Sequence, residues 1–241
     1  MAVSRVDGRG NLDLRPVKIE RGFMKFAEGS CLISMGDTKV ICTATVEERV
    51  PMWMKGRGSG WVTAEYAMLP RSGRERNSRE QLKPAGRTME IQRLIGRSLR
   101  PIIDLNILGE RMITLDCDVL SADGGTRCAS VTGAYVALVE AIASLRAQNK
   151  VKKNPLSEAV AAVSVGLVAG AEMLDLCAEE DNRAGVDMNV IMTTSGKFIE
   201  LQGTAEGQPF DRNRLNRLLD VAQVGLDVLL AKQREAVEGL L

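Results

Sequence analysis

The sequence predicts a mixed α+β fold in which strands and helices alternate in irregular order. Three kinds of segment indicate this: stretches that alternate between apolar and polar residues, one continuous apolar run, and stretches whose apolar residues recur at helical spacing. The chain has 241 residues, 45% of them hydrophobic, and this length allows a sizeable core. Because no Pro-, Gly- or Ser-rich linker interrupts the chain, we expect a single domain over residues 1–241.

The first predicted elements are a β-hairpin and a helix. Residues 29–34 and 39–47 are expected to form paired strands, because Gly36 and Asp37 between them are typical of a turn. Residues 89–100 are expected to form a helix. Its apolar stripe consists of Ile91, Leu94, Ile95 and Leu99.

A strand and a helix are predicted in the middle of the chain. Residues 111–120 alternate regularly, so one face is apolar and the other carries Asp116 and Asp118. Residues 126–145 have the spacing of a helix. Its apolar stripe consists of Ala134, Leu138, Ala141 and Leu145.

The last third of the chain predicts two strands and a long helix. Residues 159–169 are apolar almost throughout, as expected of a buried strand. Residues 186–192 alternate again and place Asp187 and Asn189 on one face. Asp211 is a plausible N-cap for a helix that directs a leucine-rich stripe inward.

The composition excludes several classes of protein and site. The chain has no histidine, so Ser-His-Asp and Cys-His nucleophiles and imidazole metal ligands are absent. The net charge of +1 excludes a uniformly basic nucleic-acid coat. The five cysteines show no C-x-x-C spacing, so we expect free thiols in a reducing compartment. With a polar N-terminus and no apolar run long enough to span a bilayer, we expect a cytoplasmic protein without membrane contact.

Basic residues concentrate between residues 71 and 100. Nine arginines and lysines face three acids there, a local charge of +6, whereas the rest of the chain carries −5. On the predicted helix, Arg93, Arg97 and Arg100 are best interpreted as a solvated basic face. The preceding stretch, residues 70–87, has the composition of a loop and favours contact with RNA or DNA phosphates.

A second candidate site is the sequence DGGTR at residues 123–127, between a predicted strand and a predicted helix. Two glycines allow the backbone to turn tightly, and a helix N-terminus offers unpaired N–H groups and positive charge. A Gly-Gly pair alone is more often only a turn. Arg127 favours a phosphate ligand, because a cation in the first helical turn opposes the helix dipole.

Paired carboxylates form a third candidate. Asp181 ends an acidic loop and Asp187 lies on the polar face of a strand, an oxygen-ligand pair that suits Mg²⁺ or Mn²⁺ beside a phosphate. By spacing alone, a solvated acidic loop remains the stronger interpretation. Asp116 and Asp118 form a comparable pair with the same ambiguity.

Five blocks together resemble the ribonuclease PH family of phosphorolytic exoribonucleases. They run in order across nearly the whole chain: GWVTAEYAMLPR (60–71), GRTMEIQRLIGR (86–97), LDCDVLSADGGTR (115–127), VDMNV (186–190) and QGTAEG (202–207). The resemblance implies a ribosomal-protein-S5-domain-2-like fold of paired βαβα units. It also implies a homohexamer built as a trimer of dimers.

The implied reaction is attack of inorganic phosphate on the 3′-terminal linkage of tRNA precursors, which releases nucleoside diphosphates and is reversible. By resemblance, the phosphate-binding positions are Arg87, Gly125, Thr126 and Arg127. Asp181 and Asp187 match the catalytic acidic pair thought to hold a divalent ion. The tRNA-contacting positions are Arg71, Arg76 and Arg79.

Two alternatives remain beside the exoribonuclease. The first is a non-catalytic RNA-binding ring subunit of the same fold, but the matched site residues are all present. The second is a small-molecule kinase, but no nucleotide-binding loop of the P-loop type is found.

Overall fold

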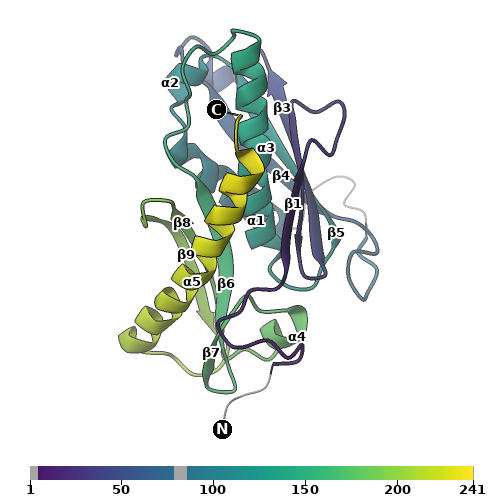
Figure 1. Ribbon diagram of the computed structural model, residues 1–241, viewed down its shortest axis with the longest axis vertical. Helices are drawn as coiled ribbons and strands as arrows, with labels where there is room; N and C mark the ends of the chain where they lie inside the picture. The colour runs from purple at the N-terminus through teal and green to yellow at the C-terminus, as the bar shows by residue number, and fades with distance from the viewer. Residues whose placement is uncertain (1–4, 79–85, 241) are drawn as a thin grey trace.

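The computed structural model describes residues 5–78 and 86–240, which form two β-sheets with helices packed against them (Figure 1). The first sheet has the order β1-β2-β3-β5-β4 and consists of β1 (Val17–Arg21), β2 (Gly29–Met35), β3 (Thr38–Glu47), β5 (Met112–Ser121) and β4 (Trp61–Met68). The second has the order β7-β6-β8-β9 and consists of β7 (Ala171–Leu174), β6 (Val160–Val168), β8 (Val186–Thr193) and β9 (Phe198–Ala205). Neighbouring strands are antiparallel except β4 and β5, which are parallel.

Five α-helices are described: α1 (Gly86–Leu99), α2 (Leu105–Leu108), α3 (Thr126–Ala147), α4 (Ala178–Asp181) and α5 (Arg212–Val237). Two short 3₁₀ helices cover Met52–Met54 and Arg100–Ile102. Asp211 caps α5 as predicted, because its carboxylate accepts a hydrogen bond from the Arg214 N–H at 2.7 Å.

The order of elements repeats the pattern strand, helix, strand, helix. In the first half, α1 connects the parallel strands β4 and β5, and β5 leads into α3. In the second half, β7 leads through α4 to the β8–β9 hairpin and then to α5. The predicted α+β class is confirmed, and the expectation of a single domain over residues 1–241 stays a prediction.

Helix α3 lies in the centre of the molecule. It packs against β2, β3 and β5 on one side and against β6 and α5 on the other, so residues are buried almost all round it. The sequence indicated only one apolar stripe, because small residues such as Ala129 and Gly133 do not reveal burial by hydropathy. Within the described chain, α3 alone is long and apolar enough to cross a bilayer, but 83% of that window is buried inside the protein. This burial is the property of a core helix.

Four of the strands, β1, β4, β7 and β9, were not predicted from the sequence. β4 had a detectable pattern, because Val62, Ala64 and Tyr66 are buried and alternate with Thr63 and Glu65. β1, β7 and β9 are short or largely exposed, so their hydropathy shows little periodicity. All five cysteines are buried and unpaired, as expected.

Candidate active site

The first part of the site is the loop between β5 and α3. Gly124 and Gly125 have φ angles of +76° and +66°, which turn the chain sharply and favour glycine. Gly125 occupies the N-cap position and no side chain caps the helix, so the N–H groups of the first turn have no intrahelical or side-chain acceptor. The Thr126 hydroxyl is held 2.9 Å from that of Tyr66 on β4. This helix end has the donors and the dipole of an anion site.

Two arginines approach this helix end from α1 and α3. Arg127 donates through Nη1 to Oε1 of Gln202 at 3.0 Å, and it lies 3.3 Å from Oε1 of Glu90. Its position is therefore set from β9 and α1 as well as from its own helix. Arg87, in the first turn of α1, is exposed and lines the same cavity. Together the two guanidinium groups and the helix end form a strongly positive corner.

The two aspartates come from α4 and β8. Burial and the nearby charge of Asp181 raise the pKa of Asp187 to about 6, and Arg127 offsets part of this rise. Burial also raises the pKa of Asp181, against the lowering effects of Arg127 and Arg87. Neither carboxylate accepts a hydrogen bond from the described part of the chain. Asp187 is half-buried and Asp181 is exposed, and two mutually repelling carboxylates without donors favour a nearby cation.

This donor set fits a hard divalent ion. Within the described residues, no group of three His, Cys, Asp or Glu side chains is arranged to hold a metal. Mg²⁺ is commonly held by one or two carboxylates, with water and substrate phosphate oxygens as its other ligands. The pair therefore suits an ion that arrives with phosphate, rather than one enclosed by protein.

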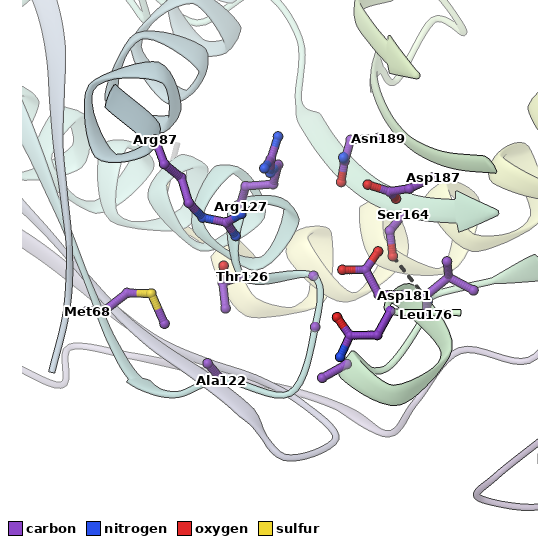
Figure 2. A pocket seen from close by; sticks show the side chains of 14 residues that line it. Met68, Arg87, Ala122, Thr126, Arg127, Ser164, Leu176, Asp181, Asp187 and Asn189 are labelled. Atoms are coloured by element: carbon purple, nitrogen blue, oxygen red, sulfur yellow. Dashed lines mark hydrogen bonds between the residues drawn. The ribbon is translucent and has the colours of Figure 1, made fainter. Parts of the chain in front are cut away.

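The corner and the aspartates face each other across a cavity (Figure 2). Arg87, Thr126 and Arg127 lie on one side, and Asp181 and Asp187 lie on the other. This cavity has a volume of about 230 Å³ and adjoins a larger one of about 830 Å³. Both are lined by the two arginines and the two aspartates, and the larger one extends along β9. The smaller cavity has room for an anion such as phosphate, and the larger one continues to the surface.

The structure thus brings together six predicted positions that are distant in the sequence: Arg87, Gly125, Thr126, Arg127, Asp181 and Asp187. Residues 179–181, interpreted by spacing as a solvated acidic loop, belong to the short helix α4. The Glu180 side chain is buried in an ion pair with Arg5 at 2.6 Å, whereas Asp181 is exposed.

The predicted RNA-contacting positions lie elsewhere. Arg71 and Arg76 are exposed in the segment after β4 and line neither cavity of the site. Arg79 lies outside the described residues. On α1, Arg97 pairs with Glu200 at 2.8 Å and Arg100 donates to the Val62 carbonyl at 3.0 Å. Arg93 and Arg97 are exposed, in agreement with the expected solvated basic face, whereas Arg100 is half-buried.

The second acidic pair does not join the site. Asp116 and Asp118 project from the face of the first sheet opposite to the one that α3 covers. Burial and its acidic neighbours Asp118 and Glu65 raise the pKa of Asp116.

Sequence reasoning missed several side chains that set the geometry. Gln202 and Glu90 hold Arg127, and Tyr66 holds Thr126. Gln202 and Glu90 lie inside the quoted sequence blocks, but no local pattern indicates which arginine they contact. Asn189 was placed on the same face as Asp187 and lines the cavity as well.

The chain matches family models along most of its length. Residues 13–143 match domain 1 of the 3′ exoribonuclease family, and residues 158–225 match domain 2. A ribonuclease PH from Moorella thermoacetica is 57% identical over 235 residues, which cover 97% of this chain and 94% of the relative. The chain belongs to the ribonuclease PH family.

Solved structures show the ribonuclease PH fold at much lower identity. Rice (Oryza sativa) Rrp46 matches with a TM-score of 0.79 over 97% of this chain and 100% of that one, at 16% identity. A chain of the Archaeoglobus fulgidus exosome with RNA bound to the active site matches with a TM-score of 0.80, over 98% and 93%, at 22% identity. The fold expected from the sequence blocks is therefore confirmed.

Membership in the ribonuclease PH family also gives the activity. The protein is a phosphorolytic 3′→5′ exoribonuclease and nucleotidyltransferase of the tRNA-processing kind, with inorganic phosphate as its co-substrate. This decides between the enzyme and the non-catalytic ring subunit in favour of the enzyme.

Proposed function

We propose that the cavity between α3 and α4 is where inorganic phosphate attacks the 3′-terminal linkage of RNA, tRNA precursors in particular. The observation that carries this proposal is the placement of an uncapped helix end and two arginines directly across from two carboxylates. Phosphate near pH 7 is already an anionic nucleophile, so the absence of histidine is no obstacle. The protein's task is to hold two mutually repelling phosphate groups in line.

In this proposal the positive corner binds the attacking phosphate. Arg87, Arg127, the Thr126 hydroxyl and the N–H groups behind Gly125 would contact its oxygens. A phosphate oxygen forms a bond to the phosphorus of the terminal linkage while the bond from that phosphorus to the 3′-oxygen breaks. The products are a nucleoside diphosphate and an RNA shortened by one nucleotide. One bond to phosphorus is exchanged for another, so the reverse reaction adds nucleotides.

We propose that Asp181 and Asp187 hold Mg²⁺ or Mn²⁺. When bound, such an ion supplies positive charge beside the phosphoryl oxygens and the leaving 3′-oxygen. The chain's own contribution is to direct both carboxylates into the cavity, where burial raises the pKa of each and Arg87 and Arg127 offset part of that rise.

We also propose that Arg71, Arg76 and Arg79 contact the RNA backbone beyond the site, and that the chain assembles into a homohexamer in the cytoplasm. Exposed arginines after β4 support the first point. Large apolar side chains on the surface of the isolated chain support self-association: Phe26 is 89% exposed, Met52 82% and Trp53 55%.

The direct test uses a tRNA with a short labelled 3′ extension, incubated with Mg²⁺ in the presence and absence of inorganic phosphate. We expect release of nucleoside diphosphates that depends on phosphate. Release of nucleoside monophosphates without phosphate would mean hydrolysis and would contradict the proposed chemistry.

A further inference from the structure

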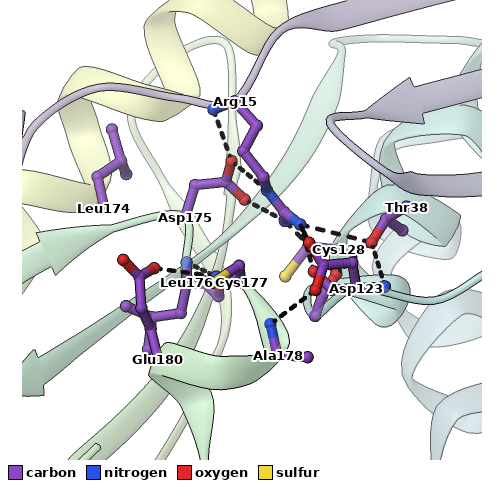
Figure 3. Close-up of polar contacts among 12 residues, drawn as sticks. Arg15, Thr38, Asp123, Cys128, Leu174, Asp175, Leu176, Cys177, Ala178 and Glu180 are labelled. Atoms are coloured by element: carbon purple, nitrogen blue, oxygen red, sulfur yellow. Dashed lines mark hydrogen bonds and ion pairs between the residues drawn. The ribbon is translucent and has the colours of Figure 1, made fainter. Parts of the chain in front are cut away.

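A buried arginine outside the cavity connects its two halves. Arg15, in the segment before β1, is 4% exposed and lines neither cavity of the site. Its Nε donates to Oδ2 of Asp175 at 2.9 Å and its Nη2 donates to Oδ1 at 2.6 Å. The Arg15 backbone N–H also donates to Oδ2, at 2.9 Å (Figure 3). Asp175 is 1% exposed and lies at the start of the turn that leads through α4 to Asp181.

The other edge of the same guanidinium contacts the phosphate-binding loop. Nη1 of Arg15 donates to the carbonyl of Asp123, and Nη2 donates to the carbonyl of Gly124 at 3.4 Å. A Cβ atom on Gly125 would lie only 3.1 Å from Nη2. The guanidinium therefore supports the backbone just before the first turn of α3.

Thr38, at the start of β3, fixes the same loop. Its hydroxyl donates to the Gly124 carbonyl at 2.7 Å and accepts a hydrogen bond from the Asp123 N–H at 2.9 Å. Nη1 of Arg15 lies 3.5 Å from this hydroxyl. Thr38 is fully buried, so these bonds are not exchanged with water.

The two halves of the site are also in direct contact. A Cβ atom on Gly124 would lie 2.6 Å from the Leu176 carbonyl oxygen, so the loop and the turn before α4 touch backbone to backbone. The Ala178 N–H donates to the Asp123 carboxylate at 3.3 Å. Asp175 has a φ of +51°, an uncommon conformation for a residue other than glycine. The contacts from Arg15 to its side chain hold this conformation in place, together with hydrogen bonds from Arg5 and Arg9 to its backbone carbonyl at 2.9 and 3.1 Å.

We propose that Arg15 is a positioning residue for phosphorolysis: its guanidinium sets the spacing between the phosphate-binding loop and the aspartate pair. Asp175 connects it to the aspartates, and the carbonyls of residues 123 and 124 connect it to the loop. Thr38 completes the support on the loop side. This inference rests on the proposed function, because it assigns phosphate to the N-terminus of α3. A flat guanidinium with five donors suits the role, since it bridges a carboxylate and two carbonyls at fixed angles.

The test compares two pairs of variants by steady-state kinetics with saturating RNA and varied phosphate. Arg15→Lys keeps the positive charge but loses the planar guanidinium with its several N–H donors. Thr38→Val keeps the shape of the side chain but loses the hydroxyl. We expect each to raise the KM for phosphate by about tenfold, which corresponds to about 1.4 kcal/mol, with unchanged RNA affinity. Thr38→Ser restores the hydroxyl and should restore the KM. Arg214→Lys, in an ion pair with Glu172 away from the site, should leave the KM unchanged.

Two readouts separate positioning from a purely structural role. Melting temperatures identify folded variants, and the rise in melting temperature on adding inorganic phosphate reports binding without turnover. If Arg15→Lys and Thr38→Val are folded and have the wild-type KM for phosphate, the inference is overturned. It is also overturned if only kcat falls, and falls in proportion to the fraction of unfolded protein. If Arg15→Lys does not fold, the comparison of Thr38→Val with Thr38→Ser decides.

Arg127→Ala distinguishes the inference from the function on which it rests. If Arg127→Ala raises the phosphate KM and the Arg15 and Thr38 variants do not, only the positioning role is wrong. If Arg127→Ala leaves the phosphate KM unchanged, the phosphate site itself is wrong, and the inference is overturned with it.

Discussion

At the scale of single residues, the site places two negatively charged carboxylates opposite two positively charged arginines. Asp181 and Asp187 repel each other, while Arg87 and Arg127 attract both of them from across the cavity. Burial weakens the ionised form of each carboxylate. Such an arrangement costs stability in the free protein and suits a site that binds charged ligands.

Asp187→Asn should abolish turnover and leave RNA binding largely intact. The variant should also melt at a higher temperature than the wild type near pH 7 when divalent ions are absent, because it removes the cost of burying a charged carboxylate and the repulsion between that carboxylate and Asp181. The folded-state pKa of Asp187 is raised from 3.8 to about 6. The wild type therefore loses stability relative to the variant as pH rises through this window, and below 3.8 the two should melt alike.

Melting curves across this pH range and a tRNA trimming assay provide the measurement. Asp118→Asn, on the far face of the first sheet, is the matched control and should trim at the wild-type rate. An unfolded Asp187→Asn protein would mean that this carboxylate has a structural role.

Arg127→Ala should raise the KM for phosphate by about tenfold to a hundredfold, because it removes a charge-assisted contact with the attacking anion. The measurement is the initial rate at varied phosphate and saturating RNA. Arg93→Ala, on the exposed side of α1, should leave this KM unchanged. Equal KM values in the two variants would remove Arg127 from the phosphate site.

At the scale of elements, helix α3 connects core and site. Most of the helix is buried between the two sheets, and its N-terminal residues line the cavity. The position of the helix N-terminus in the cavity therefore depends on how the strands pack against the rest of α3. Gly29, the first residue of β2, lies close against the backbone of α3.

Gly29→Ala should destabilise the protein by about 1–3 kcal/mol, the usual cost of overpacking. A Cβ atom at this position would lie 2.0 Å from the Ala137 carbonyl oxygen and 2.7 Å from the Ala141 nitrogen. These are backbone atoms of α3, so they move only if the helix moves. Urea denaturation measures the change. Gly207→Ala, where the added Cβ meets nothing within 4 Å, should unfold near the wild-type midpoint, and equal midpoints for both variants would contradict the packing argument.

At the scale of the whole molecule, charge is distributed unevenly along the chain, and we propose that the basic segment after β4 contacts RNA. Replacing Arg71, Arg76 and Arg79 together with glutamine should weaken tRNA binding. It should also make the plot of log affinity against log salt shallower by about 2 to 3 units, since three fewer phosphate contacts release fewer counterions. Removing three basic charges from α5, at Arg212, Arg217 and Lys232, controls for net charge. An unchanged slope in the first variant would exclude these arginines from the RNA path.

The proposed assembly predicts the mass in solution. Light scattering should give six times the 26.1 kDa of the single chain, with dissociation only at low concentration. Assembly would cover the apolar side chains that the isolated chain exposes, Phe26 and Met52 among them. A mass of 26.1 kDa at every concentration would contradict the homohexamer.

Much of this molecule can be inferred from local sequence. Alternation identified β5 and β8, the turn residues Gly36 and Asp37 identified the β2–β3 hairpin, and helical spacing identified α1 and α5. The Gly-Gly pair before Arg127 indicated the sharp turn that the structure shows there. These patterns are readable because backbone conformation and amphipathic burial repeat over a few residues. Arg87, Asp181 and Asp187 became site candidates through the resemblance of the sequence blocks, because spacing alone favoured a solvated acidic loop.

Other features depend on packing between distant segments. Arg5 and Glu180 are 175 positions apart and form a buried bidentate pair, and the Arg15 guanidinium joins two loops that are remote in the chain. No local pattern distinguishes these arginines from solvated ones, because their charge is neutralised only when the two sheets close around α3. For the same reason, the sequence alone favoured a solvated surface loop at Glu179 to Asp181. Only the folded chain shows that these residues belong to α4 and that Asp181 lines the cavity.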